Sequence, residues 1–218
     1  MRPDFTHIVN LFYDNKQFIS TNNMSRGAIF LDRDGVIIKD VNYIRNPDDV
    51  ELETGAKDLI RYFFEKGIPI VVVTNQSGIF RKFFSWEDYI KVNNRILELL
   101  GDPNPITAIY ANGLGPNSPS YSWRKPSPEM LINASFTLKI NLKKSILIGD
   151  RLSDIMSAFN GGIRKVFHVE TGHGKFERSE IINFIKNNNF KNQEMDFDVS
   201  FIKNLSEFDK RKIDDLFS

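Results

Sequence analysis

Short apolar runs that end in polar residues recur along this chain, and they predict buried strands. The runs Gly27–Leu31, Ile70–Val73 and Ser145–Ile148 are dominated by apolar and β-branched side chains. Continuous apolar runs of this kind are typical of parallel strands that are covered on both faces. Two further short strands are predicted at Ile106–Tyr110 and Val166–Val169. The pattern therefore favours a parallel sheet buried inside the protein.

Apolar side chains at helical spacing lie between these runs. A stripe from Leu59 to Phe64 ends at Gly67, and the sequence Ser85–Asp88 resembles a capped start to a helix that extends to about Leu100. Strands that alternate with helices indicate βαβ units. We therefore expect an α/β fold, a Rossmann-like three-layer sandwich in which helices cover both faces of a central parallel sheet.

A chain of 218 residues suits one α/β domain, and we expect that domain to have three parts. An N-terminal extension (1–26) would pack on the core and add an edge strand or a hairpin. The core itself would span 27–170. A C-terminal helical extension of the same domain (171–218) would contain helices near Glu177–Asn188 and Ser206–Phe217. The segments between the core strands are too short to hold a separate cap domain.

Composition and charge count against several function classes. The formal net charge is +1, which leaves no electrostatic footprint for nucleic acid or a membrane surface, and neither is an expected partner. The absence of cysteine excludes disulfides and fits a reducing cytoplasm. No apolar run is long enough to span a membrane, and the amino terminus lacks the layout of a secretory signal. We expect a cytoplasmic monomer, with a dimer as the alternative.

Two carboxylates follow the first predicted core strand directly. Asp32 and Asp34 are separated by one residue, so they would point the same way at the carboxyl end of the strand before Gly35 breaks it. That edge is where open parallel sheets bind ligands, and a divalent cation would offset the two like charges. An ordinary turn is the alternative. An EF-hand calcium loop does not fit, because Gly35 follows the second acid without a third ligand position.

Three more polar groups follow at intervals along the chain. The hydroxyl of Thr74 and the backbone N–H groups after it could bind anionic oxygens, although a polar turn would look the same. Lys125 stands beside Pro126 in a stiff segment and could offset carboxylate or phosphate charge, unless it is simply solvated. Asp150 follows another apolar strand. Asp154 sits in a first helical turn, where an acid complements the helix dipole, so Asp150 is the better candidate metal ligand.

The order of these motifs resembles that of the haloacid dehalogenase superfamily of phosphotransferases, from about Ile29 to Val169. One branch is closer still, the D-glycero-D-manno-heptose 1,7-bisphosphate phosphatases, with the histidinol-phosphate phosphatases as their near relatives. The motifs that carry this resemblance are Asp32-Arg33-Asp34-Gly35-Val36-Ile37, Thr74-Asn75-Gln76-Ser77-Gly78-Ile79, Arg124-Lys125-Pro126 and Gly149-Asp150-Arg151-Leu152-Ser153-Asp154.

The resemblance implies a Mg²⁺-dependent phosphatase. Asp32 would attack the phosphoryl group and carry an aspartyl-phosphate, and Asp34 would be the general acid and base. Thr74 and Lys125 would hold the phosphoryl oxygens. Mg²⁺ would be bound by Asp32, the main-chain carbonyl of Asp34, and Asp150. By the same resemblance, the substrate side would be formed by Arg33, Asp40, Val41, Asn42, Tyr43, Asn75, Gln76, Ser77, Arg124 and Arg151.

One segment departs from that branch. Its members carry a zinc loop just before the Arg-Lys-Pro motif, built from a Cys-x-His and a Cys-x-Cys pair. Here the ligand positions hold Asn112, Leu114, Tyr121 and Trp123, none of which can replace a thiolate or imidazole on zinc. We therefore expect no structural zinc and a loop held by packing of Tyr121 and Trp123 and by its prolines. The departure affects substrate identity and leaves the phosphatase chemistry intact.

The expected substrate is a small phosphorylated sugar such as D-glycero-D-manno-heptose 1,7-bisphosphate, in a pathway for bacterial surface sugars. Histidinol-phosphate hydrolysis is the nearest alternative. A polynucleotide 3′-phosphatase is another, because that branch also pairs Asp-x-Asp-Gly with Thr-Asn-Gln, but the balanced charge counts against it. A non-catalytic phosphosugar-binding protein is the alternative from a different class.

Overall fold

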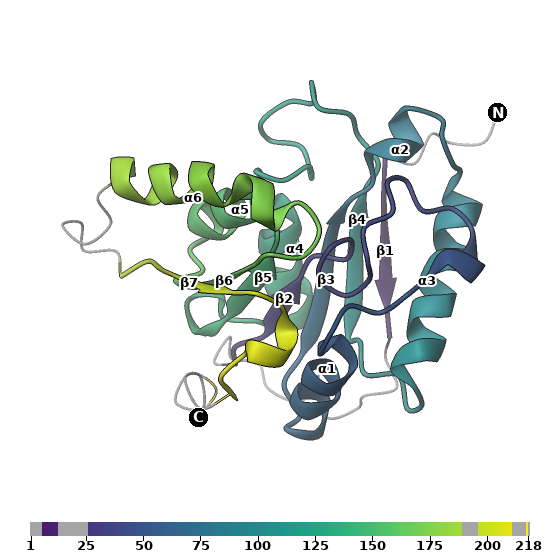
Figure 1. The fold of residues 1–218 in the computed structure, drawn as a ribbon, viewed down its shortest axis with the longest axis horizontal. Coiled ribbons are helices and arrows are strands. Elements are labelled where there is room, and N and C mark those ends of the chain that lie inside the picture. The colour runs from purple at the N-terminus through teal and green to yellow at the C-terminus, as the bar shows by residue number, and fades with distance from the viewer. Residues whose placement is uncertain (1–5, 13–25, 189–195, 211–216, 218) are drawn as a thin grey trace.

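In the part of the chain that the computed structural model describes (residues 6–12, 26–188, 196–210 and 217), seven strands form one sheet in the order β1-β4-β3-β2-β5-β6-β7 (Figure 1). Strand β1 is antiparallel to β4, and the other neighbouring pairs are parallel. The strands are β1 (His7–Leu11), β2 (Ile29–Leu31), β3 (Ile70–Asn75), β4 (Ala108–Asn112), β5 (Ile146–Gly149), β6 (Lys165–Val169) and β7 (Asp198–Ile202).

Helices cover both faces of this sheet, as the sequence predicted. They are α1 (Ala56–Glu65), α2 (Ser77–Phe80), α3 (Trp86–Leu100), α4 (Glu129–Leu138), α5 (Leu152–Gly161) and α6 (Gly174–Asn188), with short 3₁₀ turns at η1 (Pro47–Asp49), η2 (Leu142–Lys144) and η4 (Leu205–Glu207). The predicted cap of α3 is present, since the Ser85 side chain accepts from the Asp88 N–H and Asp88 accepts from the Ser85 N–H.

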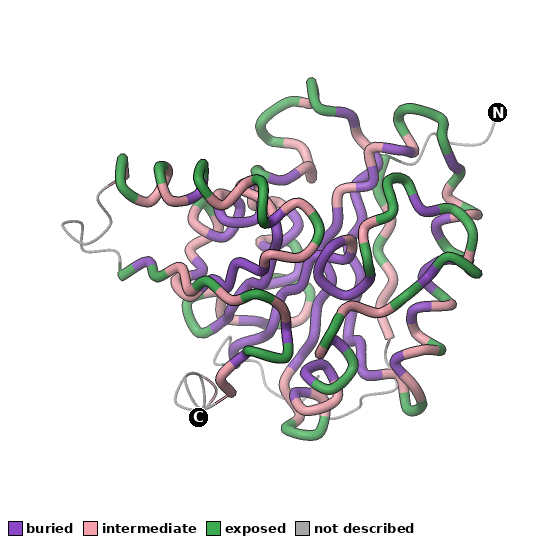
Figure 2. The backbone as a smooth tube through the Cα atoms, in the orientation of Figure 1, coloured by how far each residue is buried: buried purple, intermediate pink, exposed green. Residues whose placement is uncertain are grey.

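Alternation along the central strands creates two separate cores. Ile29 and Leu31 of β2 pack with α1 and α3 on one face, whereas Phe30 between them packs with α4, α5 and Ile181 of α6 on the other. The buried strands run through the middle of the molecule, and the outer faces of the helices are exposed (Figure 2). The three-layer α/β sandwich is therefore confirmed.

The ends of the chain differ from expectation in two respects. The sheet is mixed rather than wholly parallel, because the N-terminal edge strand pairs antiparallel with β4. The expected helical extension from residue 171 contains α6 but also β7, which lengthens the parallel sheet beside β6. An edge strand whose residues are exposed or only partly buried, such as β7, carries a much weaker apolar signal than a buried one. The expected N-terminal hairpin lies outside the described residues, as do residues 211–216 of the last expected helix. The start of that helix was placed wrongly, because Ser206 and Glu207 belong to the 3₁₀ turn η4.

The inserts between core strands are small. Residues 32–69 form a tight turn, η1 and α1, and residues 76–107 form α2 and α3, whose apolar faces join the core. Within these two described segments, nothing forms a separate cap domain. No helix among the described residues has both the length and the apolar character needed to cross a membrane. Neither of these two inserts therefore places a second domain over the edge of the sheet at the carboxyl ends of β2, β3 and β5.

Candidate active site

Three adjacent strands bring the candidate catalytic groups together. Strands β3, β2 and β5 are neighbours and run parallel, so Thr74 near the end of β3, Asp32 after β2 and Asp150 after β5 meet at one edge of the sheet. All three side chains are buried. This is the edge at which parallel α/β sheets bind their ligands.

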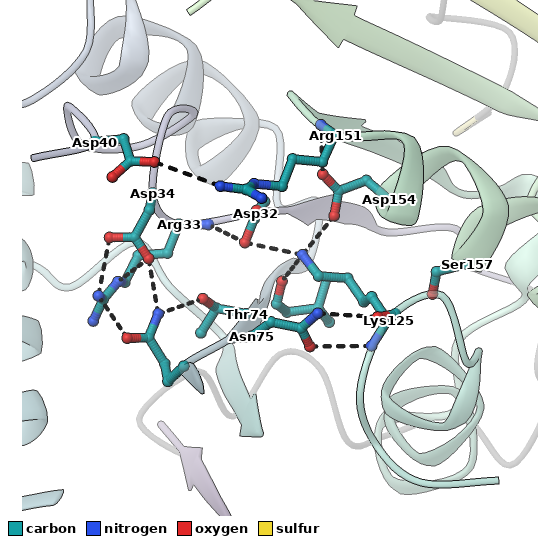
Figure 3. A network of polar contacts seen from close by, with 12 residues as sticks. Asp32, Arg33, Asp34, Asp40, Thr74, Asn75, Lys125, Arg151, Asp154 and Ser157 are labelled. Atoms are coloured by element: carbon teal, nitrogen blue, oxygen red, sulfur yellow. Dashed lines mark hydrogen bonds and ion pairs between the residues drawn. The ribbon is translucent and has the colours of Figure 1, made fainter. Parts of the chain in front are cut away.

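Lys125 reaches this edge from the loop before α4 and lies between two carboxylates. Its Nζ is 3.0 Å from Oδ1 of Asp32 and 2.5 Å from Oδ1 of Asp154, and it donates to the carbonyl of Val73 at 2.9 Å (Figure 3). Burial alone would lower the pKa of Lys125, but Asp154 and Asp32 outweigh it and raise the pKa. Lys125 is therefore a buried, permanent cation.

The backbone of that loop is fixed by one side chain of β3. Oδ1 of Asn75 accepts from the N–H of Lys125 at 3.0 Å, and Nδ2 of Asn75 donates to the Lys125 carbonyl at 3.1 Å. These two hydrogen bonds hold the backbone of Lys125 at both its N–H and its carbonyl, and so fix the position and the direction of its side chain. Asn75, expected on the substrate side, thus also places the lysine.

Asp32, Asp150 and Asp154 form a buried acidic cluster, with one oxygen of each within 4.8 Å of the others. Burial raises the pKa of Asp32 to about 6, although Lys125 opposes this, and burial together with Asp32 and Asp154 raises the pKa of Asp150 well above its usual range. Like charges at this spacing favour a bound cation.

The donor set fits a hard divalent cation. Both oxygens of Asp154 are engaged, Oδ1 by Lys125 and Oδ2 by the N–H of Arg151 at 3.0 Å. Asp150 accepts the N–H of His173 on Oδ2 at 2.8 Å, but its buried Oδ1 has no hydrogen-bond partner among the described residues. A buried carboxylate oxygen without a partner is costly unless an ion satisfies it. Asp32 and Asp150 are the side chains that suit Mg²⁺, and Asp154 is the group that holds Lys125.

Asp34 lies at the same edge, partly open to the pocket. Its carboxylate accepts from the guanidinium of Arg33 and, at 2.8 Å, from Nε2 of Gln76, which also donates to Thr74 Oγ1 at 2.8 Å. Arg33 was expected on the substrate side. Its side chain is 2% exposed, and its donors are directed to Asp34, Asn93 and Gln76. Contact of Arg33 with substrate stays a prediction, as do the other assigned roles.

A pocket of about 640 Å³ opens above these groups. Its wall includes all but one of the expected substrate residues, namely Arg33, Asp40, Asn42, Tyr43, Asn75, Gln76, Ser77, Arg124 and Arg151. Val41 is not part of the wall. Residues that the sequence did not indicate also line it, including Arg81, Phe84, Pro116, Ser153, His173 and Glu177.

His173 lines the pocket although no sequence motif indicates it. Its Nε2 lies 3.1 Å from Oδ2 of Asp40, and its backbone N–H binds Asp150. Arg151 joins the same group, 3.9 Å from Asp40 and 3.8 Å from Glu177. The position of His173 just beyond the carboxyl end of β6 was the signal that could have identified it, since that end lies at the ligand edge.

The loop that replaces the zinc loop is held by one aromatic residue and one arginine. The ring of Trp123 lies 4.3 Å from that of His7 and 5.8 Å from that of Tyr110, and Nη1 of Arg124 donates to the carbonyl of Leu114 at 3.0 Å. The expected packing of Trp123 is thus present. The expectation for Tyr121 was wrong, because this side chain is 79% exposed.

Comparisons with known proteins point to one family. A HAD-hydrolase-like family model matches residues 122–187. D-glycero-beta-D-manno-heptose-1,7-bisphosphate 7-phosphatase of Mesorhizobium japonicum is 37% identical over 150 residues, covering 66% of this chain and 69% of that protein. D-glycero-alpha-D-manno-heptose-1,7-bisphosphate 7-phosphatase of Campylobacter jejuni is 36% identical over 171 residues, covering 75% of this chain and 98% of that protein.

Solved structures share the fold. A HAD-like protein of Mesorhizobium loti superposes with a TM-score of 0.66 at 32% identity, covering 76% of this chain and 80% of that one. The D,D-heptose 1,7-bisphosphate phosphatase of B. bronchiseptica, solved with magnesium and phosphate, gives a TM-score of 0.70 at 23% identity, covering 83% of this chain and 94% of that one. The second likeness concerns the fold alone.

Proposed function

Since this chain belongs to the HAD-like phosphatase family of the D-glycero-D-manno-heptose-1,7-bisphosphate 7-phosphatases, we propose that it is a Mg²⁺-dependent enzyme that hydrolyses a sugar bisphosphate through an aspartyl-phosphate. The observation that carries the proposal is the placement of Lys125 between Asp32 and Asp154, beside a buried Asp150 oxygen without a partner. A carboxylate nucleophile, a fixed cation and a vacant ligand oxygen are what phosphoryl transfer to an aspartate requires.

In the first step Asp32 forms a bond to phosphorus while the bond from phosphorus to the sugar oxygen breaks. Oδ1 of Asp32 is engaged by Lys125 and by the N–H of Arg33 at 2.8 Å, which leaves Oδ2 to attack. Asp34 gives its proton to the departing sugar alkoxide. General acid help of this kind is typically worth about 10²–10⁴-fold.

In the second step Asp34 takes a proton from water as the water oxygen bonds to phosphorus. The bond to Asp32 breaks and inorganic phosphate leaves. Asp32 is then a free carboxylate again, and Asp34 carries its proton again. Lys125 and the hydroxyl of Thr74 hold the phosphoryl oxygens in both steps. Because Thr74 Oγ1 already accepts from Gln76, its proton is available to donate to the substrate.

Asp32, Asp150 and the main-chain carbonyl of Asp34 would hold Mg²⁺. When bound, the ion offsets the negative charge of carboxylate and phosphoryl group, which is worth several kcal/mol. The buried Oδ1 of Asp150, which has no hydrogen-bond partner among the described residues, is the oxygen that this ion would contact.

The charge of the pocket supports a substrate with more than one anionic group. Arg81, Arg124 and Arg151 all line it. Burial, then the nearby Arg151 and Arg81, lower the pKa of Arg124, which means that these guanidiniums repel one another until an anion arrives. A bisphosphate places one phosphate at Asp32 and brings a second negative charge to this group.

The test is phosphate release from heptose 1,7-bisphosphate, other phosphosugars, histidinol phosphate and a 3′-phosphorylated oligonucleotide, with Mg²⁺ or EDTA. We expect Mg²⁺-dependent preference for the heptose bisphosphate, loss of turnover in Asp32→Asn, and normal turnover in the matched surface variant Asp49→Asn. Preference for histidinol phosphate or the oligonucleotide would reject the sugar substrate. Activity that survives in Asp32→Asn would reject the aspartyl-phosphate. Cytoplasmic location and a monomeric state stay predictions.

A further inference from the structure

The side chain of Arg33, next to the proposed nucleophile, is almost fully buried and has no role in the steps above. The Arg33 side chain is 2% exposed, and it is among the largest fully buried side chains of the described residues. Burying a guanidinium is expensive unless every donor is used. Burial alone would lower its pKa, but the Asp34 carboxylate outweighs this and raises it, so Arg33 stays charged.

The guanidinium of Arg33 donates two parallel hydrogen bonds to the carboxylate of Asp34. Nε donates to Oδ2 at 3.1 Å and Nη2 donates to Oδ1 at 3.0 Å. A two-point contact between a planar guanidinium and a planar carboxylate fixes the orientation of the carboxylate as well as its position. Asp34 itself is 24% exposed and faces the pocket. Arg33 therefore sets the plane in which Asp34 presents its oxygens.

Helix α3 holds Arg33 in turn. Nη1 of Arg33 donates to Oδ1 of Asn93 at 3.1 Å, and the guanidinium lies 5.1 Å from the centre of the Tyr89 ring. Asn93 is 5% exposed and Tyr89 is fully buried, so both are fixed by the packing of the helix. Tyr89 and Asn93 are four residues apart and share one helix face.

We propose that Asn93 and Tyr89 are positioning residues that act through Arg33 to orient the Asp34 carboxylate for proton transfer. The chain of contacts runs from the packed face of α3 to Nη1 of Arg33, and from the other edge of the same guanidinium to Asp34 (Figure 3 shows its Arg33–Asp34 end). The inference rests on the proposed function, in which Asp34 protonates the leaving alkoxide.

The consequence depends on the leaving group. A sugar alkoxide needs a proton as it departs, whereas p-nitrophenolate is stable without one. The kcat/KM value covers only the steps up to departure of the first product, so it does not include hydrolysis of the aspartyl-phosphate. Loss of orientation at Asp34 should therefore lower kcat/KM for a sugar phosphate and leave kcat/KM for p-nitrophenyl phosphate almost unchanged.

The experiment measures both kcat/KM values, for heptose 1,7-bisphosphate and p-nitrophenyl phosphate, in Asn93→Leu. This change removes the acceptor of Arg33 and keeps the number of side-chain heavy atoms. We expect a drop of about 10–100-fold for the sugar phosphate and less than about threefold for the aryl phosphate, a fraction of what a general acid supplies. The matched control is Asn94→Leu on the same helix, an exposed neighbour that should change neither value.

Two comparisons separate the possible failures. Asp34→Asn should show the same selectivity more strongly, with a larger drop in kcat/KM for the sugar phosphate than for the aryl phosphate. If it lowers kcat/KM equally for both substrates, the acid role in the proposed function fails. If Asp34→Asn lowers kcat/KM selectively for the sugar phosphate, but Asn93→Leu changes neither kcat/KM value or lowers both equally, only the positioning role is overturned. Should Asn93→Leu fail to fold, Asn93→Ala serves instead, because it also removes the oxygen that accepts from Nη1 of Arg33, and the same selective loss is expected.

Discussion

Nζ of Lys125 lies 2.5 Å from Oδ1 of Asp154, closer than its 3.0 Å to Oδ1 of Asp32, the proposed nucleophile. Asp154 is fully buried and also accepts the N–H of Arg151, so it is both the cap of α5 and the anchor of the lysine. An acid in a first helical turn usually does no more than complement the helix dipole. Here the same residue sets the position of the cation that would bind the phosphoryl group.

The Asp154→Asn variant tests this role. The amide keeps an oxygen for the Arg151 N–H but loses the charge, so we expect kcat/KM to fall about 10–100-fold, the equivalent of one charge-assisted hydrogen bond. The stability of the metal-free protein should fall as well, because an amide that keeps its oxygen on the Arg151 N–H turns its NH₂ group, a donor, toward the Lys125 ammonium.

The control for that variant is Asp58→Asn, an exposed acid in the first turn of α1. It removes the same charge from the same kind of helix position, far from the pocket. Steady-state kinetics on both proteins give the comparison. Equal activity of Asp154→Asn and the parent protein would show that Lys125 does not depend on this anchor.

Gly172 lets the turn after β6 pack against Asp150, a proposed metal ligand. A Cβ at this position would lie 2.4 Å from Oδ2 of Asp150 and 2.7 Å from Cα of Gly35, and the residue has φ +58°. Gly172→Ala should therefore displace Asp150 and weaken Mg²⁺ binding by at least about tenfold, besides costing about 1–2 kcal/mol of backbone strain.

Gly162 supplies the matched control for this substitution. It also has positive φ, at +81°, but a Cβ there meets no atom within 4 Å. Gly162→Ala should pay a similar strain in the free energy of unfolding while leaving Mg²⁺ affinity unchanged. Mg²⁺ titrations followed by calorimetry distinguish the two. Equal affinities in both variants would contradict a tight fit between Gly172 and Asp150.

Mg²⁺ should stabilise this protein more strongly as the pH rises. Burial raises the pKa of Asp32 to about 6 and also raises the pKa of Asp150. In the folded, metal-free protein these carboxyls keep protons that the unfolded chain has already released, so metal-free stability falls as the pH rises through that window. Mg²⁺ binds the deprotonated form and reverses this loss.

Thermal unfolding with and without Mg²⁺ at about pH 5 and about pH 7 measures the effect, because these pH values lie on either side of the raised pKa of Asp32. The increase in Tm on adding Mg²⁺ should be larger at the higher pH. Asp150→Asn should lose most of the increase at both values. An increase that is independent of pH would mean that Mg²⁺ binds elsewhere.

Trp123 should be needed for both stability and substrate affinity. Trp123→Ala removes contacts with His7 and Tyr110, and we expect the free energy of unfolding to fall by about 2 kcal/mol. This loss is smaller than for truncation of a fully buried tryptophan, because Trp123 is only partly buried. KM should rise, because the loop also carries the Leu114 carbonyl that positions Arg124. Denaturant unfolding and steady-state kinetics measure the two effects.

Tyr121→Ala is the matched variant from the same loop. Its ring is 79% exposed, so neither stability nor KM should change. Similar losses in both variants would show that the loop depends on its overall composition and not on the Trp123 contact.

The sequence by itself determined the central strands and the chemistry at their ends. Asp32, Thr74 and Asp150 follow apolar runs, and side-chain alternation together with the carboxyl-edge rule was enough to place them at one site. These are local signals, which depend only on residues close together in the chain. The same holds for the Ser85 cap of α3, whose partner is three residues away.

Only the tertiary structure decided which groups contact each other across the fold. The pairing of Lys125 with Asp154, the link from Asn93 to Arg33, and the packing of His7 on Trp123 join segments that no local pattern connects. The edge strand β7 was missed for a related reason. Its side chains are only partly buried, so its apolar signal is weak, and pairing with β6 is what makes it a strand.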